Sequence, residues 1–241
     1  MNSKVKKSLI VIILLAGFLY HGAHWFWGKN FLHFFSGLVQ NPFQVGAFTP
    51  CSRFVAKEIT KQVKRASDTG HLKVLEVGAG SGIFTQKLEK ILGRRSAPYT
   101  LDVVEIEKKY CNLLHKRFDK NNNIAIHCTD ILSWRPAYKY DYIISALPFT
   151  LLSFNFVRTV FSLYKNLLQP NGMLSYYEHM WLPGLKQHFL TGKEGEDYKA
   201  KRTYLQKFIK KYSFKSVDIW ANVTPVRVYH GTFKPEESQH L

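Results

Sequence analysis

Residues Lys73 to Phe84 read K-V-L-E-V-G-A-G-S-G-I-F, and this stretch decides the fold. Its first half has the nearly continuous apolar pattern of a strand that is buried on both faces. Three glycines then crowd a turn where a helix is expected to begin, and glycine lets a ligand approach the backbone closely. The stretch therefore predicts a buried strand, a ligand-binding turn and a helix. The apolar residues are Leu72, Val74, Leu75 and Val77, and the glycines are Gly78, Gly80 and Gly82.

Two acidic residues follow at the ends of the next two predicted strands. Glu105 ends the run that starts at Thr100, and it lies 23 positions after Gly82. Dinucleotide-binding folds place a carboxylate at this point to hold ribose hydroxyls. Asp130 ends the run I-A-I-H-C-T-D that starts at Ile124. The spacing G-x-G-x-G differs from G-x-G-x-x-G, which weakens the case for a pyrophosphate seated on the helix N-terminus.

Strand, glycine turn and two acids in this order resemble the class I S-adenosylmethionine-dependent methyltransferases. In that family the glycine turn passes the methionine end of the cofactor, the first acid binds the ribose, and the second reaches the adenine amino group. The resemblance implies S-adenosyl-L-methionine as the cofactor. The alternative is an α/β domain whose glycines only shape a turn. The implied cofactor-binding residues are Glu76, Gly78, Gly80, Gly82, Glu105, Asp130 and Ser145.

The expected fold class is α/β, a Rossmann-like methyltransferase domain with a seven-stranded, mostly parallel sheet, an antiparallel last strand, and N-terminal membrane-associating helices. A helix that starts near Pro50 is expected to turn Phe54, Val55, Ile59 and Val63 inward. The expected domains are a membrane anchor or amphipathic helical region at 1–40, a methyltransferase domain at 41–234 and a polar tail at 235–241. The expected strands are 73–77, 100–105, 124–127, 142–146, 173–177, 216–220 and 227–233, and the helices between and after them are 85–92, 108–118, 154–168 and 198–212.

Charge narrows the class of partner. The chain has 241 residues and a net charge of +17, from 34 Lys and Arg against 17 Asp and Glu. Such an excess favours a polyanionic surface, either an anionic membrane or a nucleic acid. The three cysteines, Cys51, Cys111 and Cys128, are scattered and odd in number, which predicts unpaired thiols in a reducing compartment. No cluster of His, Cys and carboxylates predicts a metal site.

The N-terminal segment favours the membrane. Three lysines precede the apolar run Leu9 to Tyr20, and tryptophans follow at Trp25 and Trp27. A signal peptide, a single span and an interfacial anchor or shallow hairpin are the three interpretations. An apolar stripe at helical spacing between Trp25 and Gln40 supports the interfacial anchor, although packing against the domain would give the same pattern. We expect membrane association at the cytoplasmic face, as on a bacterial inner membrane.

The loop after the fourth strand bears on the methyl acceptor. It reads S-A-L-P-F from Ser145 to Phe149, and it should lie beside the transferred methyl group. Ribosomal RNA adenine dimethyltransferases carry N-L-P-Y or N-L-P-F at this place, where the Asn accepts from the adenine amino group. This chain has Ala146 in that position. An amino group buried without its acceptor costs about 1 to 3 kcal/mol, which argues against an adenine substrate.

Two other segments resemble the bacterial, Rhodobacter-like phospholipid N-methyltransferases. The first is N-P-F-Q-V-G-A-F-T-P-C-S-R-F, from Asn41 to Phe54, and the second is W-A-N-V-T-P-V-R-V-Y, from Trp220 to Tyr229. With the cofactor motifs, this resemblance covers about residues 25 to 232. The chain departs from the family pattern where Cys51 replaces a common Ser and where Thr224 and Val226 flank the one retained proline.

The resemblance implies methyl transfer to the amine of phosphatidylethanolamine, and further to its methylated forms. That amine must lose a proton, and a cationic product is stabilised by aromatic faces. We expect Phe149 and Tyr177 to be ring walls of the acceptor site and Glu178 or His179 to be the proton acceptor, since all lie at strand ends. The alternative roles are core packing for the rings and helix capping for the carboxylate.

A basic helix from Lys199 to Lys211 is expected either to bind lipid headgroups or to cover the sheet as a solvated amphipathic helix. Three functions therefore remain open at the level of sequence. The first is a phospholipid N-methyltransferase with anionic lipids and phosphatidylethanolamine as partners. The second is an RNA or DNA methyltransferase, and the third is a membrane-tethered protein that binds the cofactor without catalysis.

Overall fold

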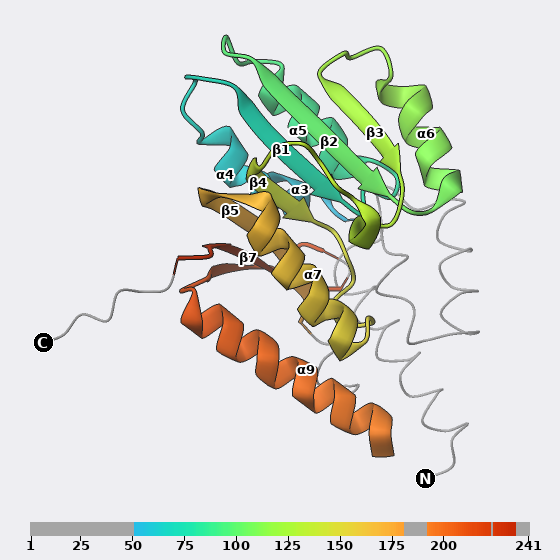
Figure 1. Cartoon of the computed structure of the whole chain (residues 1–241), viewed down its shortest axis with the longest axis vertical. Coiled ribbons are helices and arrows are strands. Elements are labelled where there is room, and N and C mark those ends of the chain that lie inside the picture. The colour runs from blue at the N-terminus through green and yellow to red at the C-terminus, as the bar shows by residue number, and fades with distance from the viewer. Residues whose placement is uncertain (1–50, 181–191, 223, 235–241) are drawn as a thin grey trace, which may run out of the picture. The chain divides into compact units, whose positions relative to one another are not determined.

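The strand that contains Lys73 to Val77 is central in a seven-stranded sheet of order β3-β2-β1-β4-β5-β7-β6 (Figure 1). This computed structural model describes residues 51–180, 192–222 and 224–234. The expected anchor at 1–40 and the expected tail at 235–241 lie outside the described residues. The strands are β1 (Leu72–Val77), β2 (Tyr99–Glu105), β3 (Ile124–Cys128), β4 (Tyr140–Ser145), β5 (Leu168–His179), β6 (Lys215–Ile219) and β7 (Val226–Thr232). The helices are α3 (Arg53–Ile59), α4 (Lys61–Lys64), α5 (Ile83–Leu92), α6 (Lys108–Phe118), the short 3-10 helix η2 (Ile131–Ser133), α7 (Phe154–Leu167) and α9 (Gly192–Lys211).

Strand direction follows the expected pattern. β1 pairs in parallel with β2 and β4, and the outer neighbours β3 and β5 continue the parallel arrangement. β7 runs antiparallel to both β5 and β6. The prediction of a mostly parallel sheet closed by an antiparallel strand is confirmed. The parallel strands end together at one side of the sheet, which we call the carboxyl edge.

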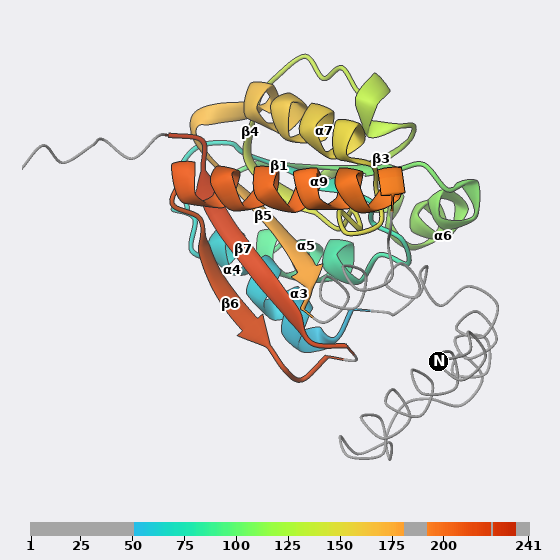
Figure 2. The ribbon, with the colours of Figure 1, turned by 90° about the horizontal axis from the view of Figure 1, so that it is seen from below.

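Helices cover both faces of the sheet, and Figure 2 shows α7 and α9 on one face and α3, α4 and α5 on the other. Each face of the sheet has its own hydrophobic core. The core under α7 and α9 contains Leu75, Val77 and aromatic residues of these two helices. The second contains Val74, Leu88 and the apolar residues of α3 and α6. Since alternate residues of β1 enter different cores, its apolar run is continuous in sequence, as a strand buried on both faces requires.

Three details differ from the sequence expectations: the exposure of Phe54, the start of β5 and the start of α9. Val55, Ile59 and Val63 point inward as predicted, but Phe54 is 44% exposed. β5 begins five residues earlier than expected, because Leu168 pairs with Tyr140 ahead of a register shift between Tyr140 and Tyr142. α9 begins at Gly192, six residues before the expected start, and its buried Leu205 and Phe208 fit the expected alternative of an amphipathic helix that covers the sheet. Among the described residues, no helix is both long and apolar enough to cross a bilayer.

A buried carboxylate, Asp102, organises the outer part of the sheet. It accepts hydrogen bonds from His127 at 2.7 Å, from the Tyr138 hydroxyl at 2.6 Å and from the Tyr140 hydroxyl at 2.8 Å. Burial alone would raise the pKa of Asp102, but these three donors outweigh it and lower that pKa. The charged carboxylate thus joins β2, β3 and β4 on the face that carries α7.

Replacing Asp102→Ala should lower the free energy of unfolding by about 2 to 4 kcal/mol, because two tyrosine hydroxyls and one imidazole lose their acceptor. Urea unfolding at neutral pH measures this loss. The control is Asp119→Ala, at a carboxylate that is 60% exposed and should contribute less than about 1 kcal/mol. Equal losses in the two variants would contradict the structural role of Asp102.

Candidate active site

The glycine turn follows β1 at the carboxyl edge, and each glycine meets a different constraint. Gly78, Gly80 and Gly82 all have positive φ, at 73°, 53° and 82°. A Cβ on Gly82 would lie 2.8 Å from the Leu114 side chain of α6, which would have to shift, and the φ of 82° is one that residues with a side chain rarely adopt. A Cβ on Gly80 would meet nothing within 4 Å. The middle of the turn is therefore open, which is what close approach of a ligand requires.

Glu105 connects this turn to the end of β2. Its Oε2 accepts a hydrogen bond from the Gly80 backbone N–H at 2.7 Å, and its Oε1 accepts from the Glu107 N–H at 2.8 Å. The side chain is only 5% exposed. Each carboxylate oxygen can accept a further hydrogen bond, so Glu105 can hold the turn and still bind hydroxyl groups.

Glu76 is the most unusual group of the site. Its side chain is fully buried in β1, and neither carboxyl oxygen has a hydrogen-bond partner. Burial raises the pKa of Glu76 to about 8, and the charge of Glu105 adds to this rise. Thr85, in the first turn of α5, is the polar group that acts to lower that pKa, but it lies outside hydrogen-bonding geometry. A carboxyl group in this position suits a cationic ligand that would supply the missing partner.

Asp130 and Ser145 lie at the ends of β3 and β4. Asp130 caps η2, because one of its oxygens accepts from the Leu132 N–H at 2.9 Å. Ser145 is fully buried, and its hydroxyl lies 2.9 Å from the Tyr164 hydroxyl of α7. Asp130 is therefore partly exposed next to the carboxyl edge, whereas Ser145 contacts the helix layer below it.

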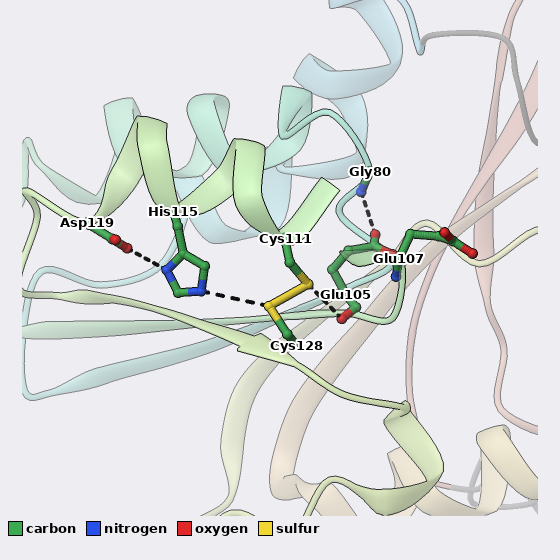
Figure 3. Close-up of a disulfide and its surroundings, with 7 residues drawn as sticks. All are labelled: Gly80, Glu105, Glu107, Cys111, His115, Asp119 and Cys128. Atoms are coloured by element: carbon green, nitrogen blue, oxygen red, sulfur yellow. Dashed lines mark hydrogen bonds and ion pairs between the residues drawn. A yellow bond between two sulfur atoms is a disulfide. The ribbon is translucent and has the colours of Figure 1, made fainter. Parts of the chain in front are cut away.

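The structure corrects the prediction that all cysteines are unpaired. Cys111 of α6 and Cys128 at the end of β3 form a disulfide, shown in Figure 3, and only Cys51 is a free thiol. The disulfide lies next to the backbone of Glu105, and His115 contacts the Cys128 sulfur at 3.7 Å. It links α6, the helix that follows Glu105, to the end of β3, two residues before Asp130. Because the two residues are distant in sequence, their spacing alone could not predict the pair.

The four predicted acceptor-site residues divide between the two faces of the sheet. Phe149 is 1% exposed and packs with Phe161 and Tyr176 in the core below α7. Glu178 points to the same face, where Arg202 lies 3.6 Å away. Burial raises the pKa of Glu178, although Arg202 and Lys201 act against that rise.

Tyr177 and His179 point to the opposite face, toward α3, because side chains alternate along β5. The Tyr177 ring makes an edge contact with Phe84 of α5. The centroids of the Tyr177 and His179 rings are 5.8 Å apart. The Tyr177 hydroxyl hydrogen bonds to the Cys51 thiol, whose pKa burial raises to about 11. Both groups are therefore neutral at physiological pH.

A chain of hydrogen bonds that sequence reasoning missed joins the start of α3 to His179. The Ser52 N–H donates to Asn222 Oδ1 at 2.8 Å across 170 positions of sequence. The Asn222 amide donates to the Thr224 carbonyl at 2.9 Å, and the Thr224 hydroxyl bonds to His179 Nδ1 at 2.7 Å. A signal was present in the sequence, since Ser52 lies in the segment Asn41 to Phe54, and Asn222 and Thr224 lie in the segment Trp220 to Tyr229.

Comparison with known proteins decides the family. Residues 51–191 match the sequence pattern of the family described as ribosomal RNA adenine dimethylase, which is more than half of the chain. The chain belongs to this family. Its members are S-adenosylmethionine-dependent methyltransferases, so the resemblance to class I methyltransferases is confirmed at the level of family, fold and cofactor.

Individual relatives agree with this assignment. Malonyl-[acyl-carrier protein] O-methyltransferase of Bacillus cereus is 27% identical over 150 residues, which are 61% of this chain. The matched region spans about half of that protein, 53% of its length. The solved N-methyltransferase NodS of Bradyrhizobium japonicum has a TM-score of 0.56 at 18% identity, covering 79% of this chain and 96% of NodS. Its complex with S-adenosyl-L-homocysteine has a TM-score of 0.55 at 17% identity, covering 85% and 98%. At such identities the two structures show a shared fold.

The side chains of this adenine dimethylase family member fit the cofactor of the family. Glu76 offers a buried carboxyl without a hydrogen-bond partner, which suits the ammonium group of the methionine part. Glu105 suits the ribose hydroxyls, Asp130 is the acid that the resemblance assigns to the adenine, and the open side of Gly80 leaves room beside the turn. When bound, the cofactor supplies a methyl group on a sulfonium sulfur. No group of His, Cys and carboxylates among the described residues forms a metal site.

Replacing Glu105→Ala should weaken cofactor binding by at least about tenfold, because it removes both the acceptor for ribose hydroxyls and the bond that holds the Gly80 turn. Isothermal titration with S-adenosyl-L-homocysteine measures the loss. The control is Glu107→Ala, an exposed neighbour whose backbone bonds to Glu105 but whose side chain is in solvent. Unchanged affinity of the Glu105 variant would contradict the assignment.

Glu76 should make the stability of the cofactor-free protein depend on pH. The folded protein keeps the carboxyl proton up to about pH 8, while the unfolded chain loses it near the ordinary value of 4.5. The folded state thus binds more protons between these values, and the free energy of unfolding must fall as pH rises through this window, by an amount on the order of a few kcal/mol.

The variant Glu76→Gln should lose this dependence, because an amide has no proton to release. Urea unfolding at pH 4.5 and pH 8.5 should give the smallest difference in stability between the two proteins at pH 4.5, where the window begins, and a relatively more stable variant at pH 8.5. The exposed control Glu107→Gln should follow the unmodified protein at both values. Parallel pH profiles for wild type and Glu76→Gln would rule out a buried, protonated Glu76.

Proposed function

We propose that this chain transfers methyl groups to the amine of phosphatidylethanolamine, and to its mono- and dimethyl forms, at the cytoplasmic surface of a membrane. The observation that carries this proposal is the contact between Ser52 and Asn222. It joins the two segments whose sequences resemble the phospholipid N-methyltransferases. The two residues are 170 positions apart, yet their segments resemble the same family and are in contact. This supports a common role for the two segments at the carboxyl edge.

The group that this contact positions is His179. Thr224 Oγ1 holds its Nδ1 at 2.7 Å, so the tautomer and ring orientation depend on the loop that also carries Asn222. The ring of Tyr177 lies beside it and is partly buried. An imidazole with one nitrogen held and an aromatic neighbour is suited to accept a proton from an amine and to pack against a cationic product.

The proposed reaction needs little from the protein beyond placement and proton removal. His179 would accept the proton that the amine nitrogen must lose, and the bound cofactor would supply the methyl group to that nitrogen as its own bond from carbon to sulfur breaks. The products are the methylated amine and S-adenosyl-L-homocysteine. Placing the amine in line with the methyl group supplies most of the acceleration, since a bimolecular displacement becomes effectively intramolecular.

The same geometry is less suited to an adenine acceptor. Ala146 occupies the position of the base-binding Asn, and its backbone N–H donates to the Val77 carbonyl at 2.8 Å. The neighbouring Leu147 N–H points to Ser145 Oγ at 3.4 Å. No side-chain amide is therefore present at this position to accept from an adenine amino group, and Phe149 is buried in the core.

Ribosomal RNA methylation is the second candidate function, because residues 51–191 match the adenine dimethylase family. The net charge of +17 suits either an anionic lipid surface or RNA. The retained L-P-F sequence after Ala146 supports this candidate as well. Because the chain lacks the Asn that would accept from the adenine amino group, adenine is a weaker candidate for the methyl acceptor than the lipid amine.

A transfer assay separates the two acceptors. The purified full chain is incubated with methyl-labelled cofactor and either vesicles of phosphatidylethanolamine and phosphatidylglycerol or unmethylated ribosomal RNA. We expect label in lipid, and we expect His179→Gln to lower kcat by at least about tenfold with unchanged cofactor affinity, because general base catalysis is removed. The control His71→Gln changes an exposed histidine and should retain activity. Label found only in RNA would refute the lipid proposal.

A further inference from the structure

A cationic groove lies between α3–α4 and α5, away from the glycine turn. It has a volume of about 500 Å³. Seven of its ten lining residues are Lys or Arg, and one, Glu58, is acidic. We call it the α4–α5 groove. The basic residues are Lys57, Lys61, Lys64, Arg65, Lys87, Lys90 and Arg94.

The charges of the α4–α5 groove are not balanced by the protein. Glu58 is paired with Lys61 at 2.9 Å and lies 3.7 Å from His230, so the one carboxylate is already engaged. The ion pairs found among the described residues include none of the other six cations. Like charges gathered in a concave surface repel one another, and an anion bound there would relieve that repulsion.

The groove is separate from the cofactor site. α5 begins at Ile83, next to the glycine turn, and runs back from the carboxyl edge, so Lys87 lies at its middle, Lys90 in its last turn and Arg94 just beyond its end. The cofactor acids Glu105 and Asp130 follow β2 and β3 and do not line the groove. An anion bound between α4 and α5 would therefore occupy a second site, whatever the acceptor at the carboxyl edge proves to be.

The composition of the surface favours a lipid headgroup over RNA. Phe54, Lys57, Lys61 and Lys64 follow one another at spacings of three, four and three, and Phe54 is 44% exposed. An exposed aromatic residue in line with lysines is typical of surfaces that lie in the headgroup region of a membrane. No aromatic ring lines the groove itself, whereas single-stranded RNA is bound by stacking its bases on such rings.

The order of the elements along the chain also favours a lipid headgroup as the ligand of the groove. α3 starts at the carboxyl edge, where the Ser52 N–H bonds to Asn222, and α4 ends at the groove. The sequence that precedes α3 carries the apolar run Leu9 to Tyr20. We propose that the α4–α5 groove binds the phosphate group of anionic lipid headgroups. Lysine and arginine donors then surround the phosphate oxygens, and a membrane plane along α3 meets both the groove and the carboxyl edge.

The experiment uses the full chain and a monomeric short-chain lipid, dihexanoyl phosphatidylglycerol, so that no bilayer contact contributes. The groove variant is Lys57→Glu/Lys64→Glu/Lys90→Glu, three exposed side chains of the groove. The matched control is Lys116→Glu/Lys120→Glu/Lys139→Glu, three exposed lysines outside it with the same change in net charge. Titration calorimetry should show binding to the unmodified chain, at least tenfold weaker binding to the groove variant, and unchanged binding to the control.

Five further measurements decide the outcome: the thermal midpoint and the binding of S-adenosyl-L-homocysteine, inorganic phosphate, dihexanoyl phosphatidylcholine and ribosomal RNA. The thermal midpoint and the affinity for S-adenosyl-L-homocysteine should be equal in all three proteins, and the milder set of Lys→Gln changes at the same groove positions serves if the Glu set fails to fold. Inorganic phosphate and dihexanoyl phosphatidylcholine should bind weakly or not at all. Equal losses in groove and control variants, no binding of phosphatidylglycerol, tighter binding of inorganic phosphate, or a groove variant that loses only RNA binding would each overturn the proposal.

Discussion

The hydrogen bond from the Gly80 amide to the Glu105 carboxylate is the interaction on which the active site depends. It joins the turn after β1 to the end of β2, so that two adjacent parallel strands share one polar link at the carboxyl edge. Because Glu105 is almost fully buried, this charged hydrogen bond is shielded from water and stronger than a surface bond. The open side of Gly80 and the buried carboxyl of Glu76 both lie next to this link. The site is thus prepared for a cationic, hydroxyl-bearing ligand by the sheet itself.

A second constraint comes from the antiparallel end of the sheet. β7 returns beside β5, and this pairing places His179 opposite Val226, so the loop before β7 lies at the carboxyl edge. That loop holds Asn222 and Thr224, which contact Ser52 and His179. In the function proposed above, the first half of the sheet would bind the methyl donor, and the second half with the start of α3 would bind the acceptor.

Much of the fold follows from local pattern. α6 has the predicted bounds, and most strands differ from the prediction by only one or two residues, because buried parallel strands and amphipathic helices have strong periodic signals. β5 is the main exception, since its first residues pair with Tyr140 across an irregularity that no local pattern marks. Phe54 is another, because an apolar residue at a helical position can face solvent or a partner as well as the core.

The sequence by itself determined the donor: a strand, three glycines and two acids in order are local features, and each acts through its own short segment. Only the tertiary structure decided which candidate acceptor residues share a face. Tyr177 and His179 point toward α3, whereas Phe149 and Glu178 face α7 and α9, because β5 is covered on both sides and its side chains alternate. The Ser52–Asn222 contact, the Cys111–Cys128 pair and the α4–α5 groove likewise depend on residues far apart in sequence. Such contacts result from how helices and strands pack, and no single segment encodes them.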